Sequence, residues 1–189
     1  MNRSISFLQS ASSGRVVLIL FVLTNVVYGT ILGYSIPLVF SYSPESILFD
    51  MSPAGYSYAE AIELLQSLGP DGRNAYLTIQ IPIDLVYPAM FAVSYALMIT
   101  WIFKQGLPKH SRVYLLAFVP ILAGLFDYLE NAGIVAMLYA FPDVSENLVT
   151  SASSFTIAKS GFTTLFFLVL LVSLIYLAIW RMKERATSK

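Results

Sequence analysis

Four long apolar segments constrain this chain more strongly than any other feature of its sequence. A helix that crosses a bilayer needs about 20 mostly apolar residues. Four segments meet that requirement, at about 16–40, 76–103, 113–141 and 153–180. We therefore predict an all-α integral membrane protein in which residues 1–189 form one membrane domain, a four-transmembrane-helix antiparallel bundle.

The composition agrees with this assignment and excludes several classes of function. Charged residues make up 12% of the chain, about half the share that is typical of soluble domains. Lysine and arginine together number eleven, as do aspartate and glutamate, so there is no basic surface to bind nucleic acid. Cysteine is absent, which excludes disulfides and thiol catalysis. His110 is the one histidine; we predict no metal site and no cofactor.

The basic residues are distributed unevenly along the chain. Nine of the eleven lie at the two termini or between the second and third segments, and Arg73 and Lys159 are the exceptions. Membrane proteins carry such an excess on their cytoplasmic side. We therefore predict that both termini are cytoplasmic, including Arg185 and Lys189 of the C-terminal tail. A short chain with this pattern is typical of a prokaryotic plasma (inner) membrane.

The connection at about 41–75 is the one sizeable segment outside the spans. Within it, Ser57 and Glu60 have the spacing of a helix capping box, and apolar residues follow at helical intervals. Gly69 and Pro70 then end the pattern. We predict one amphipathic helix at about 58–68 in this outer loop. It would act as a lid over a site within the membrane, or as a strap that shortens the loop.

Ionisable residues inside the apolar segments are the strongest functional signal in the chain. Each costs about 2.5–3.5 kcal/mol at the centre of a membrane helix, so such residues usually face the interior of a bundle. Asp84, Asp127 and Glu130 lie inside the second and third segments, and Lys159 lies near the outer end of the fourth. At 1.5 Å per residue, all four lie roughly 9–21 Å below the outer ends of their segments. This depth predicts a single polar pocket in the outer half of the bilayer.

Residue spacing places further polar side chains beside these four. Asp127, Glu130 and Asn131 follow the i, i+3, i+4 spacing of one helix face. Stripes on the second and first segments, at similar depth, add four more side chains: Gln80, Tyr87, Asn25 and Tyr28.

Two backbone features accompany this polar stripe. Pro88 lacks the N–H that would pair with the carbonyl of Asp84, which leaves an acceptor in need of a donor. Gly29 and Gly33 form a GxxxG pattern, which is typical of membrane helices that approach closely.

Three interpretations of the polar pocket follow. In the first, it binds a lipid-like or isoprenoid-like hydrophobic molecule, or acts on that molecule by acid–base chemistry. If the protein is an enzyme, the catalytic residues are Asp84, Asp127 and Glu130. The ligand-binding residues are Asn25, Tyr28, Gln80, Tyr87, Asn131 and Lys159, the last also being the counter-ion.

In the second interpretation, the carboxylates relay protons or a cation during transport. In the third, the polar residues hold helices together in a non-enzymatic structural or assembly subunit. Its partners would be membrane lipids and a second copy of the chain or another membrane protein. For Lys159 alone, extension of the side chain to the outer membrane surface is a further alternative.

Overall fold

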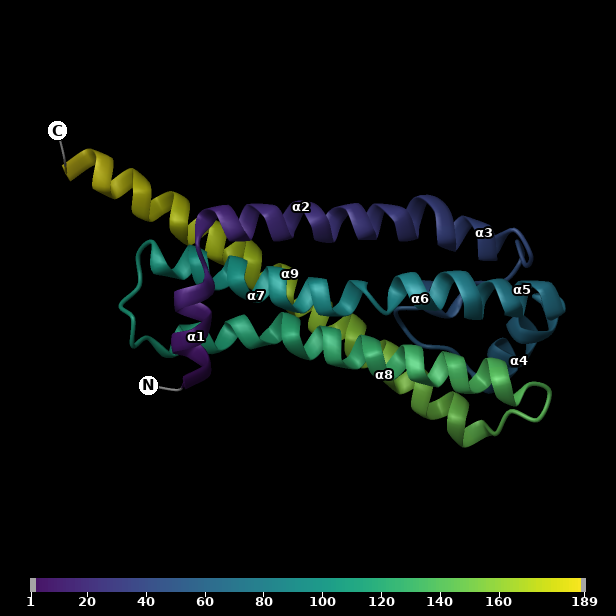
Figure 1. The fold of residues 1–189 in the computed structure, drawn as a ribbon. Helices are drawn as coiled ribbons and strands as arrows, with labels where there is room; N and C mark the ends of the chain where they lie inside the picture. The colour runs from purple at the N-terminus through teal and green to yellow at the C-terminus, as the bar shows by residue number, and fades with distance from the viewer. Residues whose placement is uncertain (1–2, 188–189) are drawn as a thin grey trace.

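The computed structural model describes the backbone of residues 3–187 and the side chains of residues 3–183, and this part of the chain is helical without strands. Four helical segments are long and apolar enough to cross a membrane: Gly14–Phe40, Gly69–Lys104, Arg112–Ala140 and Glu146–Lys183. They lie side by side in alternating directions (Figure 1). The predicted fold class is confirmed, and the four spans indicate an integral membrane protein.

The first span consists of three consecutive elements, α2 (Gly14–Thr30), η1 (Ile31–Ser35) and α3 (Ile36–Phe40). The second consists of α5 (Gly69–Ala75), η3 (Tyr76–Gln80), α6 (Ile81–Asp84) and α7 (Tyr87–Lys104). The third consists of η4 (Arg112–Phe118) and α8 (Val119–Ala140), and the fourth is α9 (Glu146–Thr187). Three shorter elements lie outside the spans: α1 (Arg3–Ala11), η2 (Phe49–Met51) and α4 (Tyr58–Ser67).

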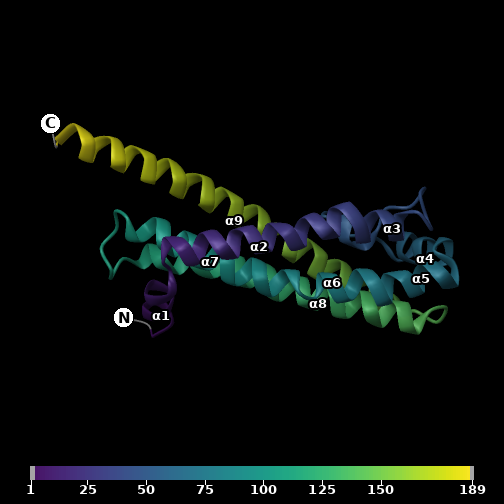
Figure 2. The same ribbon diagram turned by 45° about the horizontal axis from the view of Figure 1, so that its top comes forward.

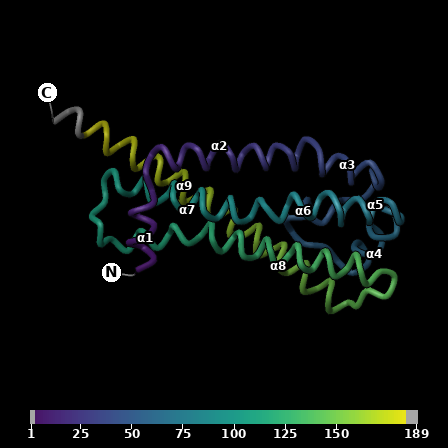
Figure 3. Tube along the Cα trace, viewed as in Figure 1, coloured from purple at the N-terminus to yellow at the C-terminus, as the bar shows by residue number. Residues whose placement is uncertain are grey.

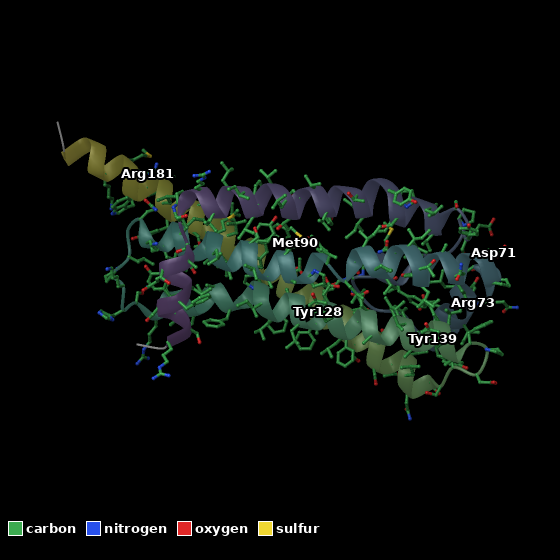
Figure 4. All side chains as sticks on the ribbon, in the orientation of Figure 1. Asp71, Arg73, Met90, Tyr128, Tyr139 and Arg181 are labelled. Atoms are coloured by element: carbon green, nitrogen blue, oxygen red, sulfur yellow. The ribbon has the colours of Figure 1, made fainter. Side chains whose placement is uncertain are left out.

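Both described ends of the chain lie at the same end of the bundle, which we call the tail end (Figure 3). The opposite end, which carries η2, α4 and the α8–α9 turn, is the loop end. Asp71 and Arg73 lie there, whereas Arg181 lies at the tail end (Figure 4). The predicted cytoplasmic location of the tail end stays a prediction. The side chains of Arg185 and Lys189 lie outside the described residues.

The helices do not form a closed ring. α8 packs along both α7 and α9, while α2 packs against α7. The C-terminal part of α9 leaves the other helices as it approaches the tail end (Figure 2). Residues of both α2 and α9 line an open pocket, which we call the groove between α2 and α9.

The second span begins at Gly69, earlier than the predicted start near residue 76, so the loop is shorter than expected. Gly69 adopts φ +62°, a left-handed conformation that glycine tolerates and that lets the chain turn. Pro70 lies in the first turn of the new helix, where the missing N–H costs nothing. The Gly-Pro pair thus ends α4 and also starts the next helix.

The amphipathic helix expected at about 58–68 is present as α4, and its capping box forms. The Ser57 hydroxyl accepts from the backbone N–H of Glu60, and the Glu60 carboxylate accepts from the backbone N–H of Ser57 at 2.7 Å. Hydrogen bonds from the Ser57 hydroxyl and backbone lower the pKa of Glu60. Ala61, Leu64 and Leu65 are buried against the bundle. α4 therefore caps the loop end of the bundle.

The N-terminal helix α1 is an element that the sequence analysis did not predict. It packs against α7 at the tail end and buries Ile5. The Lys104 ammonium donates to the carbonyls of Gln9 and Ser12, at 2.7 and 2.8 Å. These bonds satisfy one carbonyl in the last turn of α1 and one in the residue that follows the helix, where no backbone donors of the helix itself remain.

Proline causes two irregular turns at the loop-end half of the first and second spans. A proline within a helix cannot donate a hydrogen bond, and its ring collides with the carbonyl four residues earlier. Immediately before Pro82 the helix widens into the π-turn η3, in which the N–H of Ile81 bonds to the carbonyl of Tyr76, five residues back. The same arrangement, η1, precedes Pro37 in the first span. Each wide turn changes the direction in which neighbouring side chains point.

Glycine decides how closely two of the spans approach. A Cβ atom on Gly124 of α8 would lie 2.7 Å from the backbone oxygen of Pro88 in α7. By contrast, a Cβ atom on Gly29 or Gly33 would have no neighbour within 4 Å. The predicted close approach at the GxxxG pattern therefore does not occur between helices of this chain, because α2 is held through its other face.

We expect Gly124→Ala to destabilise the bundle by about 1–3 kcal/mol, because a backbone oxygen cannot move aside cheaply. Gly161→Ala is the matched control in α9, where an added Cβ has no neighbour within 4 Å. Chemical unfolding in mild detergent measures both free energies. Equal stability of the two variants would contradict the inferred contact.

We expect Ser57→Ala to destabilise α4 by about 1 kcal/mol, because the backbone N–H of Glu60 loses its capping acceptor. Hydrogen exchange of the α4 amides, compared with those of α8 in the same sample, measures this local loss. Unchanged exchange in α4 would show that packing alone maintains the helix.

Candidate intramembrane binding site

A cavity of about 560 Å³ lies between the spans and extends from η2 at the loop end past the middle of the bundle. Residues from all four spans and from η2 line it. Seven of the nine side chains singled out from the sequence are among them: Asn25, Tyr28, Gln80, Asp84, Tyr87, Asp127 and Lys159. The fold therefore brings together residues that are up to 134 positions apart in the chain.

The polar part of the cavity lies between two apolar cores. One core occupies the loop end and includes Ile81, Ile134 and Ala152. The other occupies the tail end and includes Phe91 and Phe166. Along each of the second, third and fourth spans, the ionisable residues lie between members of these two cores. The cores thus hold the three helices together on both sides of the buried charges.

Lys159 joins the third and fourth spans. Its ammonium lies 3.2 Å from the Asp127 carboxylate and also contacts the Glu130 carboxylate. The Lys159 side chain is 20% exposed and lines the cavity. It therefore does not extend to the membrane surface, which was the alternative considered from the sequence.

Glu130 and Asn131, the other two predicted residues, do not line the cavity. Both are fully buried, and each contacts a side chain that does line it. The Asn131 amide donates to the Asp84 carboxylate at 2.9 Å, and Glu130 contacts Lys159. These two residues therefore form a second layer of contacts that holds Asp84 and Lys159 in place.

Asp50 is a lining residue that the sequence analysis did not select. It belongs to η2, and its carboxylate accepts a hydrogen bond from the hydroxyl of Tyr76. The two residues before it, Leu48 and Phe49, are buried in the loop-end core. This apolar pair is the one sequence signal that the loop enters the bundle, because a loop facing water rarely holds two large apolar side chains in succession.

Pro88 breaks the second span beside Asp84, as its position in the sequence suggested. α6 ends at Asp84 and α7 begins at Tyr87. The Tyr128 hydroxyl of α8 donates to the carbonyl of Leu85, within the break, at 2.9 Å. This hydrogen bond ties the break in the second span to α8.

Aromatic side chains form one wall of the cavity. The rings of Tyr28 and Tyr87 stack with centroids 5.3 Å apart. Tyr87, Phe91 and Tyr95 continue as a row along α7, with neighbouring centroids 5.7 and 4.8 Å apart. The Asn25 amide donates to the Phe21 carbonyl at 2.7 Å and to the Tyr95 hydroxyl at 3.4 Å. Asn25 therefore helps to hold the wall together.

Gln80 differs from the other polar residues of the cavity. Its side chain is fully buried, and neither its amide nitrogen nor its oxygen has a hydrogen-bond partner among the described residues. It lies at the end of the π-turn η3, which directs it towards the cavity. Buried amides are almost always paired in folded proteins, so Gln80 is placed to pair with a molecule that enters the cavity.

Within the described part of the chain, no three carboxylate or imidazole side chains are grouped as ligands of one metal ion. Comparisons of the chain with protein-family models, curated proteins and solved structures found no match.

We expect Lys159→Met to destabilise the protein by about 3–5 kcal/mol, because it leaves buried carboxylates without a counter-ion. Adding Glu130→Gln should recover part of this loss, since it removes one of the unpaired charges. Thermal unfolding of the wild type, both single variants and the double variant measures the coupling. Strictly additive effects would show that the two side chains do not interact.

Proposed function

We propose that this multi-pass membrane protein binds an amphiphilic hydrophobic molecule in the cavity between its spans. The observation that carries the proposal is the buried, unpaired amide of Gln80 beside a cluster of carboxylates. A cavity of about 560 Å³ lies within the usual range for small-molecule sites, about 300–1,000 Å³.

The groove between α2 and α9 supplies the route of entry from the bilayer. Tyr28 of α2 and Phe167 of α9 both line the cavity, yet they are 42% and 54% exposed. Their exposed surfaces would face lipid chains rather than water. A hydrophobic molecule can therefore enter sideways from the membrane without crossing the loop end.

The lining of the cavity has two chemical characters, which match an amphiphile. Phe21, Phe167 and Leu170 are apolar and suit a hydrocarbon portion. Asp84 and Gln80 lie at the buried side and suit a polar end group. By the predicted orientation, this polar end would lie in the outer half of a prokaryotic plasma membrane.

The alternative is a structural or assembly subunit in which the same residues only join helices. The contacts of Lys159 with Asp127 and Glu130 fit that role. A network that serves only to join helices gains nothing from a buried amide without partners, because each such group costs about 1–3 kcal/mol. Gln80 therefore favours ligand binding over assembly alone.

Native mass spectrometry on protein gently extracted from its own membrane tests the proposal. We expect a small hydrophobic mass to co-purify with the wild type and to be lost from Asp84→Asn and Asp127→Asn. Asp143→Asn is the matched control, since it removes one exposed acid at the loop end. Thermal unfolding of each variant shows whether a variant that loses the mass is still folded.

A protein partner or a second copy of the chain, without any small molecule, would overturn the proposal. In that case Asp84→Asn should also lose thermal stability, because this acid would be structural.

A further inference from the structure

We infer that the ligand carries a protonated amine: it is a hydrophobic alkylammonium with N–H donors, held by its charged end. This inference rests on the proposed binding function and specifies the class of ligand. Three observations carry it: the charge balance of the site, its unpaired hydrogen-bond acceptors and its aromatic wall.

Carboxylates outnumber cations around the cavity. Asp50, Asp84 and Asp127 line it, Glu130 lies behind it, and Lys159 is the one basic residue that lines it. Arg73, the other basic residue in the loop-end half of residues 3–183, is engaged elsewhere: it donates to the carbonyl of Leu65 at 2.7 Å and lies 4.3 Å from the centre of the Phe141 ring.

One lysine cannot balance four ionised carboxylates, so the remaining acids must either hold a proton or pair with a further cation, because an unpaired charge away from water is costly. A cationic ligand supplies the missing charge, whereas a carboxylate or phosphate ligand would increase the imbalance. The surplus of carboxylates therefore selects against the anionic head groups of common lipids.

The unpaired polar atoms point the same way. Among the residues that line the cavity, two buried acceptors have no hydrogen-bond donor: Asp50 Oδ1 and Gln80 Oε1. Among these lining residues, the one unpaired donor group is the Gln80 amide nitrogen. An ammonium group offers three N–H donors and no acceptor, so it matches this surplus.

The aromatic wall adds a third attraction for a cation. Ring faces of tyrosine and phenylalanine attract positive charge, by about 0.5–2 kcal/mol according to how far the site is desolvated. Tyr28, Tyr87 and Phe91 line the same cavity as Asp84. A primary or secondary amine thus meets all three features, whereas a quaternary ammonium lacks N–H donors and a neutral alcohol lacks the charge.

The test uses the full-length protein in nanodiscs of zwitterionic lipid. Dodecylamine is the probe, and an alkylamine of this kind is protonated at neutral pH, as lysine is. Its matched controls share the twelve-carbon chain: dodecyltrimethylammonium, dodecanol and dodecanoate. Native mass spectrometry gives the stoichiometry, and the rise in melting temperature with probe concentration gives the affinity.

We expect one dodecylamine per chain, with an affinity at least tenfold higher than that of each control. Asp84→Asn and Gln80→Leu should each weaken dodecylamine binding at least tenfold, and Asp143→Asn should leave it unchanged. Gln80→Leu should also raise the melting temperature of the ligand-free protein, because it removes an unpaired buried amide. A structural role for Gln80 predicts the opposite change.

Two outcomes separate the failure of this inference from the failure of the proposed function. Binding of dodecanol, dodecanoate or dodecyltrimethylammonium as tightly as dodecylamine would retain a ligand site but overturn the amine assignment. Absence of binding by all four probes, with no small molecule co-purifying from the native membrane, would overturn both.

Discussion

The contact of Lys159 with Asp127 and Glu130 is the interaction on which the rest of the structure depends. It joins α8 and α9 at a depth where a bilayer offers no water to solvate a charge, so neither side can be left alone. Apolar cores lie on both sides of it along the bundle. The charges thus set how α8 and α9 lie against each other, and the apolar cores stabilise that register.

Departures from regular helix geometry then give the cavity its shape. Pro82 produces the wide turn that carries Gln80, and Pro88 breaks the second span beside Asp84. Gly124 lets α8 approach the break closely. Because irregular backbone is tolerated at membrane depth only where protein or a polar cavity surrounds it, these features belong to the interior face of the bundle.

The protein itself satisfies part of the hydrogen bonding and charge of the site. The pair of Asp84 with Asn131 and the contacts of Lys159 satisfy some of its polar groups, while Gln80 and Asp50 keep unpaired atoms. A site of this kind, lined by residues of both α2 and α9, supports the proposed binding of an amphiphile whose polar end completes the network.

The sequence by itself determined the four spans, the capped helix before the second span and most of the polar cluster. These features follow from local rules, because each depends only on residues within one segment of the chain. The rules are the length of an apolar segment, the i, i+3, i+4 spacing of one helix face, and capping chemistry. The tertiary structure decided the rest. It placed Asp50 in the cavity and turned Lys159 inwards, and it left the GxxxG of the first span without a partner helix among the described residues. All three outcomes depend on which helices become neighbours. The neighbours of a helix are determined by packing between residues far apart in the sequence, and the pattern within one segment does not specify that packing.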